Sequence, residues 1–99
     1  MTDETTRTIL ITGGTRGIGY ATAEALIKAG NTVAITGTTP ESVEKAERAL
    51  SAASSIALRS TGQVAGIACD VRDAASVRRA IYTVVTRFGG LDVLINNAG

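Results

Sequence analysis

Four short apolar runs alternate along the chain with stretches that have helical spacing, and this alternation limits the possible folds more than any other feature. The runs are rich in Ile, Val and Leu, which is typical of strands buried on both faces. They occupy residues 8–13, 32–37, 63–70 and 91–96. Strands that alternate with helices of this length predict a parallel sheet with right-handed crossover connections. We therefore expect an α/β fold.

The first predicted helix covers residues 17–29 and stops at Gly30-Asn31, a pair that tolerates the left-handed conformation of many helix ends. Its apolar face is expected to consist of Ile18, Ala21, Ala25 and Leu26.

Two further helices carry recognisable end signals. Thr39 can cap the second, and Pro40 suits its first position. Asp73 can cap the third, which the pair Gly89-Gly90 ends. The positions expected to face the sheet are Val43, Ala46 and Leu50 in the second helix and Val77, Ile81, Val84, Val85 and Phe88 in the third.

The composition excludes several classes of function. With 99 residues, 44% of them hydrophobic and 19% charged, the chain is one small globular domain. A net charge of +1 and only 3% aromatic residues argue against a nucleic-acid partner. The sequence has no histidine, which excludes a histidine general base and histidine metal ligands, and we expect no metal site.

The single cysteine and the N-terminal segment bear on location. Cys69 cannot form a disulfide within the chain and is expected to be a small buried residue, which suits a reducing compartment. The first ten residues contain acidic side chains and no apolar segment of a signal peptide. No apolar run approaches the roughly 18 residues of a membrane span. These features predict a soluble, cytoplasmic protein without a membrane partner.

A glycine-rich loop, with Gly13, Gly14, Gly17 and Gly19, joins the first strand to the first helix. Glycines suit a sharp turn where a phosphate must approach the backbone, and the following helix presents N–H groups and a positive dipole end. A tight turn without a ligand is the poorer alternative, because four glycines lie between an apolar strand and an apolar helix. The spacing matches neither the G-x-G-x-x-G fingerprint nor a P-loop.

The order Thr12-Gly13-x-x-x-Gly17-Ile18-Gly19 resembles the coenzyme loop of the classical short-chain dehydrogenase/reductase family. Three further segments are similar to family motifs in the same order: CDV (69–71), FGGLDVLI (88–95) and NNAG (96–99). The resemblance implies a Rossmann-type three-layer αβα sandwich with strand order 3-2-1-4, the first four strands of a doubly wound fold. It also implies that residues 1–99 are the N-terminal portion of an NAD(P)-binding domain.

The resemblance assigns coenzyme-binding roles to individual residues. Asp70, with Val71, matches the position that reads the adenine amino group; without the motif, Asp70 could equally be a solvated turn acid. The positions around the pyrophosphate and the adenosine ribose are matched by Gly13, Thr15, Arg16, Gly17, Ile18 and Gly19 in the loop and by Asn97, Ala98 and Gly99 beside the ribose.

The end of the second strand indicates which coenzyme is bound. An NAD enzyme usually has Asp or Glu there, whereas this chain has Thr38 and Thr39 and no acid before Glu41. The missing carboxylate removes the repulsion against a 2′-phosphate, and Arg16, unless it is only a solvated loop charge, supplies a cation. This combination is similar to the NADP(H)-preferring members, although many of them have an arginine where Thr38 stands. We expect NADP(H) rather than NAD(H).

The family's catalytic residues are absent from this sequence. Members transfer hydride between the nicotinamide and a carbonyl or alcohol carbon with a Tyr, a Lys four residues later, a Ser and commonly an Asn, all downstream of NNAG. Here Tyr20 and Tyr82 are followed four residues on by Glu24 and Thr86. We expect the parent protein to be an NADP(H)-dependent oxidoreductase of small carbonyl or alcohol substrates, often a homotetramer by resemblance, and this chain alone to be inactive.

The fourth strand is expected to form a bare, apolar sheet edge. This predicts that the 99 residues are a fragment: a truncated chain, a nicked chain or the described part of a longer chain. One alternative is a non-catalytic nucleotide-binding or structural domain. Another is a methyltransferase-type α/β domain, which would usually carry an acid where Thr38 and Thr39 stand.

Overall fold

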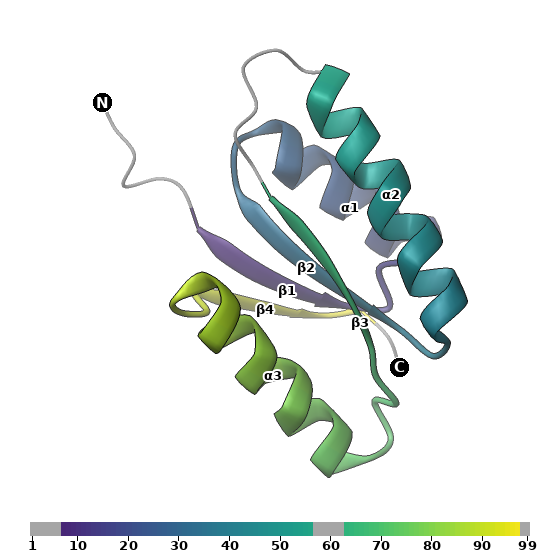
Figure 1. Ribbon diagram of the computed structural model, residues 1–99, viewed down its shortest axis with the longest axis vertical. Helices are drawn as coiled ribbons and strands as arrows, with labels where there is room; N and C mark the ends of the chain where they lie inside the picture. Colours follow the sequence, from purple (N-terminus) through teal and green to yellow (C-terminus); the bar gives the residue numbers. More distant parts are fainter. Residues whose placement is uncertain (1–6, 57–62, 98–99) are drawn as a thin grey trace.

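Strands and helices alternate throughout the computed structural model, which describes residues 7–56 and 63–97. Within these ranges the elements are β1 (Thr8–Thr12), α1 (Gly17–Lys28), β2 (Thr32–Gly37), α2 (Pro40–Ile56), β3 (Val64–Ala68), α3 (Ala74–Phe88) and β4 (Val93–Asn96). All strand pairs are parallel, and the strand order is β3-β2-β1-β4 (Figure 1). The predicted α/β fold and its strand order 3-2-1-4 are confirmed.

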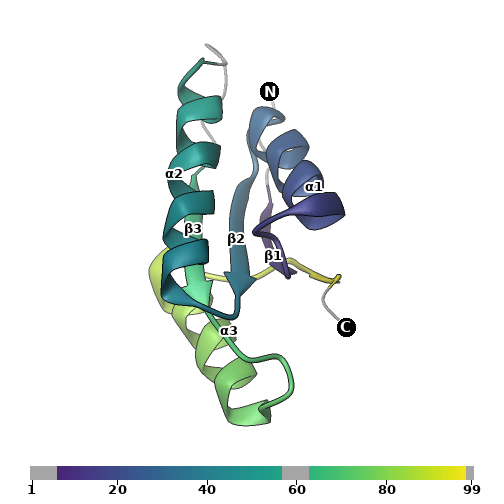
Figure 2. The same ribbon diagram turned by 90° about the vertical axis from the view of Figure 1, so that its right-hand side faces the viewer.

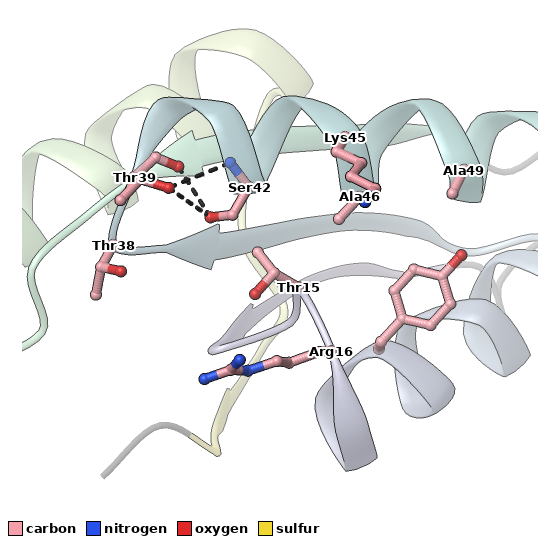
Figure 3. Close-up of a pocket in the computed structure, with 9 residues that line it drawn as sticks. Thr15, Arg16, Thr38, Thr39, Ser42, Lys45, Ala46 and Ala49 are labelled. Carbon is pink, nitrogen blue, oxygen red and sulfur yellow. Dashed lines mark hydrogen bonds between the residues drawn. The ribbon is translucent and has the colours of Figure 1, made fainter.

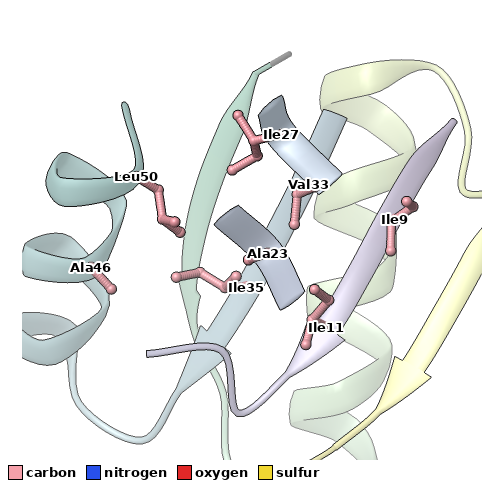
Figure 4. Packing of buried hydrophobic residues seen from close by; sticks show 8 residues of the cluster. All are labelled: Ile9, Ile11, Ala23, Ile27, Val33, Ile35, Ala46 and Leu50. Carbon is pink, nitrogen blue, oxygen red and sulfur yellow. The ribbon is translucent and has the colours of Figure 1, made fainter. Parts of the chain in front are cut away.

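Alternate side chains of each strand enter separate cores on the two faces of the sheet. Ile9 and Ile11 of β1 pack against α1 and α2 (Figure 4), whereas Leu10 between them packs with Val84 of α3. The helices accordingly form two layers, with α1 beside β1 and α2 beside β3 on one face (Figure 2). The three-layer sandwich is confirmed, and burial on both faces explains why the strands are apolar throughout.

The helix ends agree with the sequence signals. The Thr39 hydroxyl accepts a hydrogen bond from the Ser42 amide at 3.2 Å at the start of α2. Asp73 accepts one from the second residue of α3 at 3.0 Å. Gly30 and Gly89, with φ of 98° and 85°, take the left-handed conformation after α1 and α3. These contacts stabilise the first and last turns, which otherwise lack backbone partners.

The predicted apolar face of α1 is confirmed for Leu26, which packs against the core, and is wrong for the other three positions. Ile18 is 79% exposed, and Ala21 and Ala25 are also exposed. The buried positions are Gly19, Ala23 and Ile27. Ile18 belongs to the first turn, beyond the carboxyl end of β1, so the face that covers the sheet begins one residue later.

In α2 the predicted face is confirmed, because Val43, Ala46 and Leu50 are all buried. In α3 one position differs. Val85 is 40% exposed, and Ala80 is buried beside Val84 instead. A small residue at this point allows α3 to approach the sheet closely.

The position of α2 depends on Gly66 in β3. A Cβ atom at Gly66 would lie 2.4 Å from Val43 Cγ1, so only glycine allows this approach without a shift of α2. The Gly66 amide also donates to Glu47 Oε1 at 2.9 Å. This contact fixes the first turns of α2 above the carboxyl ends of β2 and β3.

Two other expectations can be compared with the described residues. Cys69 is buried, as predicted. Among residues 7–56 and 63–97, β4 pairs with β1 alone and Leu94 is half exposed, so β4 is an apolar sheet edge. No helix in these ranges has the length and apolar character needed to cross a membrane.

Candidate functional site

The predicted site residues lie at the carboxyl edge of the sheet. The glycine loop follows β1, Thr38 and Thr39 follow β2, Asp70 and Val71 lie between β3 and α3, and Asn97 follows β4. Because the strands are parallel, these segments meet at one edge, where open α/β sheets bind their ligands. Ala98 and Gly99, which were also predicted to bind coenzyme, lie outside the described residues.

Neighbouring strands hold the glycine loop from both sides. The Gly13 amide donates to the Thr36 hydroxyl at 3.1 Å, and the Gly14 amide donates to the Thr36 carbonyl at 3.0 Å. From the other side, the Asn97 side-chain amide donates to the Gly13 carbonyl at 3.1 Å. Gly13 has a φ of 74°, a conformation that glycine adopts at little cost. These hydrogen bonds fix Gly13 and Gly14, the start of the loop, between β2 and Asn97.

Thr12 connects the ends of β1 and β4. Its hydroxyl accepts from the Asn97 backbone amide at 3.0 Å and lies 3.2 Å from Asn96 Oδ1, to which it donates. Asn96 and Asn97 therefore tie the end of β4 to the end of β1.

The first turn of α1 suits an anion. Arg16 is the N-cap residue, makes no side-chain capping bond and precedes a turn without acidic residues. The first amides of a helix have no acceptor within the helix, and the dipole leaves this end positive. Gly17 has a φ of 65° and open space where a Cβ atom would lie. A phosphate fits this donor set.

A cavity of about 480 Å³ lies between this loop, the end of β2 and the facing sides of α1 and α2 (Figure 3). Its lining consists of Thr15, Arg16, Tyr20, Thr38, Thr39, Ser42, Lys45, Ala46 and Ala49. The structure therefore brings together four predicted residues, Thr15, Arg16, Thr38 and Thr39. Figure 3 shows Thr15 and Arg16 on the loop opposite Ser42 and Lys45 of α2.

The lining is cationic and rich in hydroxyl groups. It has two cations, Arg16 and Lys45, and no carboxylate among the nine described lining residues. The Thr39 hydroxyl donates to Ser42 Oγ at 2.9 Å, and Ser42 Oγ in turn donates to the Thr39 carbonyl at 3.1 Å. Guanidinium, ammonium and hydroxyl donors are the groups that bind phosphate esters in proteins.

The α2 side of this cavity and Tyr20 were not predicted from the sequence. Ser42, Lys45, Ala46 and Ala49 are spaced i, i+3, i+4 and i+7, which places them on one helix face. That spacing was a usable signal. Because the buried face of α2 was derived from its apolar residues alone, Lys45 was given no role.

Asp70 lies outside this cavity and is held by Arg72. Its Oδ1 atom accepts from the Arg72 backbone amide at 3.0 Å and from Nε at 3.1 Å, and Oδ2 accepts from Nη2 at 3.3 Å. The Arg72 side-chain hydrogen bonds, then its backbone hydrogen bond, lower the pKa of the Asp70 carboxyl group below its ordinary value. The carboxylate is therefore charged and oriented at neutral pH. The sequence motifs assign no role to Arg72.

Val71 lines a smaller cavity on the α3 side of the sheet. This cavity has a volume of about 190 Å³ and also contains Thr12, Thr36 and Asn96. Its lining is distinct from that of the larger cavity, so Val71 and Arg16 face different spaces.

Comparison with known proteins agrees with these motifs. The family model described as "short chain dehydrogenase" matches residues 7–99. The chain belongs to the short-chain dehydrogenase family. The relatives include a 3-oxoacyl-(acyl-carrier-protein) reductase of Aquifex aeolicus, 40% identical over 91% of this chain, and a sorbitol dehydrogenase of Cereibacter sphaeroides, 40% identical over 93%. The chain covers 34% and 32% of these two proteins, so it spans about a third of their length.

Solved short-chain dehydrogenases share the fold. A short-chain type dehydrogenase/reductase from Mycobacterium ulcerans superposes with a TM-score of 0.84 at 31% identity, over 94% of this chain and 32% of that one. An NADH-dependent reductase complexed with NAD gives a TM-score of 0.78 at 37% identity, over 95% and 36%. The family consists of oxidoreductases that use a nicotinamide coenzyme and act on small molecules.

Proposed function

We propose that this chain is the N-terminal, coenzyme-binding portion of an NADP(H)-dependent short-chain oxidoreductase. The whole protein transfers hydride between the nicotinamide and a carbonyl or alcohol carbon of a small substrate. The observation that carries the coenzyme preference is the cavity with Arg16 and Lys45 on opposite walls and no carboxylate among its described lining residues.

The glycine loop and the larger cavity bind different parts of the coenzyme. Amide donors from Gly17 to Gly19 at the start of α1 hold the pyrophosphate. Arg16 and the Thr38 hydroxyl hold the 2′-phosphate, the Thr39 hydroxyl exchanges its bond to Ser42 Oγ for one to the phosphate, and Thr15 lies beside them. An acid at the end of β2 would accept from a ribose 2′-hydroxyl and repel a phosphate, which is why two threonines there favour NADP(H).

Lys45 and Ser42 strengthen this assignment. They lie on α2, across the cavity from Arg16, so a 2′-phosphate between the two walls meets a cation from each side. Such charge-assisted contacts are roughly twice as strong as neutral hydrogen bonds.

The other predicted residues lie along the same edge of the sheet. Asp70 accepts a hydrogen bond from the adenine amino group, and Val71 lies beside the base. Ile18, largely exposed at the start of α1, covers one side of the bound coenzyme. Asn97, with Ala98 and Gly99, lies beside the ribose. When bound, the nicotinamide supplies or accepts the hydride.

The catalytic groups belong to a part of the protein beyond this sequence. No tyrosine here is followed four residues on by lysine. The relatives are about three times as long as this chain, which supports a longer parent protein. We expect the 99-residue chain alone to be inactive and the parent to form a homo-oligomer.

The function is tested by turnover. The full-length protein, whose intact mass is measured first, is mixed with NADPH or NADH and a panel of aldehydes and ketones, and coenzyme oxidation is followed at 340 nm. Turnover with NADPH in preference to NADH is expected. Absence of turnover with either coenzyme, in a protein of more than twice 10.1 kDa, would contradict the proposal.

A further inference from the structure

The turn after β3 holds Asp70 in an unusual way. Its backbone amide donates to the Ser76 hydroxyl at 3.0 Å, and its carbonyl accepts from the Asp73 amide at 3.0 Å. The main chain of Asp70 is therefore fixed by α3, and only its side chain remains to be placed. Arg72 places it, through one backbone and two side-chain hydrogen bonds.

These contacts leave the carboxylate with little acceptor capacity. Two carboxylate oxygens offer about four lone-pair positions. Arg72 uses two on Oδ1 and one on Oδ2. One position, on Oδ2, is not used by Arg72. Since the pKa of the carboxyl group is lowered, this position accepts a hydrogen bond and does not donate one.

The Asp70–Arg72 pair differs from the other surface ion pairs among the described residues. Glu24–Lys28 and Glu44–Arg48 are helical i,i+4 pairs joined by a single short contact. Arg72 engages both carboxylate oxygens of Asp70, although its side chain is 88% exposed. Because an ion pair this exposed adds little to stability, we expect its effect to appear in what Asp70 recognises.

We propose that Arg72 is a positioning residue that makes Asp70 select a purine with a 6-amino group over one with a 6-oxo group. The inference rests on the proposed function, in which Asp70 faces the adenine of the coenzyme. An amino group donates to the unused position on Oδ2. A 6-oxo group places its acceptor oxygen against the acceptor oxygen Oδ2. The carboxylate cannot turn away, because Arg72 holds both of its oxygens.

The test compares two coenzymes whose purines differ in the 6-substituent, amino or oxo, and in the proton that N1 carries in the oxo form. The dissociation constants of NADPH and of its hypoxanthine analogue are measured by fluorescence titration on the full-length protein; if NADH binds more tightly, NADH and its hypoxanthine analogue are used. The variants are Arg72→Ala, Arg72→Lys and Asp70→Asn. Arg79→Ala is the control, because Arg79 is an exposed arginine on α3 outside the site.

The wild-type protein should prefer the adenine coenzyme by roughly tenfold or more, the factor expected for a hydrogen bond to a charged acceptor. In Arg72→Ala the preference should fall to about threefold or less, while the unfolding midpoint stays within about 2 °C. Arg72→Lys should retain only part of the preference, because lysine lacks the fork that engages both oxygens. Asp70→Asn should abolish the preference, and Arg79→Ala should leave it unchanged.

Two results would overturn the inference and leave the proposed function intact. They are a wild-type preference that survives in Arg72→Ala, and an equal loss of preference in Arg79→Ala. A wild-type protein that binds neither NADPH nor NADH would instead contradict the proposed function itself.

Discussion

The side-chain amide of Asn97 donates to the Gly13 carbonyl at 3.1 Å, across 84 residues of sequence. Gly19 lies at the same point, since a Cβ atom there would lie 2.4 Å from the Gly13 oxygen and 2.7 Å from Asn97 Nδ2. The glycine loop, the first turn of α1 and the end of β4 therefore meet in one closely packed junction. This junction sets the loop geometry that we propose for pyrophosphate binding.

Gly19→Ala tests this junction. The added methyl group meets a backbone oxygen that cannot move independently of the loop, so we expect a loss of about 1–3 kcal/mol in the free energy of unfolding, together with weaker coenzyme binding. Urea unfolding measures the first effect. Gly90→Ala is the control, because nothing lies within 4 Å of a Cβ atom there. Equal stability of the two variants would show that the junction tolerates a side chain.

The two cations on the walls of the larger cavity should strengthen the binding of NADPH and not that of NADH. Removing Arg16 or Lys45 by alanine substitution should weaken NADPH binding by about 1.5–3 kcal/mol for Arg16 and less for Lys45, because an ammonium lacks the bidentate fork of a guanidinium. NADH binding should change little, because NADH lacks the 2′-phosphate. Titration with both coenzymes measures this. Lys28→Ala removes the same charge from the far end of α1 and should affect neither; a matching loss there would point to net charge instead.

Thr38→Asp should move the coenzyme preference towards NAD(H). A carboxylate at the end of β2 repels a 2′-phosphate and accepts from a 2′-hydroxyl, so NADPH affinity should fall by roughly tenfold or more while NADH affinity is kept or improved. The ratio of the two dissociation constants is the measurement. Thr83→Asp, on the exposed side of α3, adds the same charge elsewhere. If NADPH affinity is unchanged in Thr38→Asp, Thr38 does not contact the phosphate.

The fold was predictable from the sequence in more detail than the candidate site was. Strand positions and helix caps depend on local chemistry, as at Asp73 and Gly89, and these predictions were confirmed. The face of α1 was not predictable from periodicity, because Ile18 has helical spacing but lies past the end of the sheet. Likewise, the residue spacing indicates which face of α2 carries Lys45. It does not indicate that α1 packs against α2 so that Lys45 lies opposite Arg16.

Arg72 shows a further limit. Its contact with Asp70 depends on a turn that brings its backbone amide and its guanidinium to one carboxylate. No periodicity or composition indicates such a turn, and an arginine two residues from an acid in sequence is ordinarily a solvated charge.

The exposed edge of β4 should make the 99-residue chain self-associate. Leu94 is half exposed on a strand that has β1 as its one partner in the described sheet. Leu94→Lys should reduce this self-association, because a charged sheet edge resists strand pairing. Sedimentation velocity over a range of concentrations measures the effect, with Val85→Lys on α3 as the control. A wild-type chain that stays monomeric at every concentration would contradict the expectation.

The central claim is that the cavity between α1 and α2 accepts the 2′-phosphate of NADP(H). The most direct measurement is a pair of equilibrium titrations of the full-length protein with NADPH and with NADH, at low and high salt. We predict that NADPH binds at least about tenfold more tightly, and that its advantage narrows as salt screens Arg16 and Lys45. Equal affinities, or tighter binding of NADH, would contradict the account.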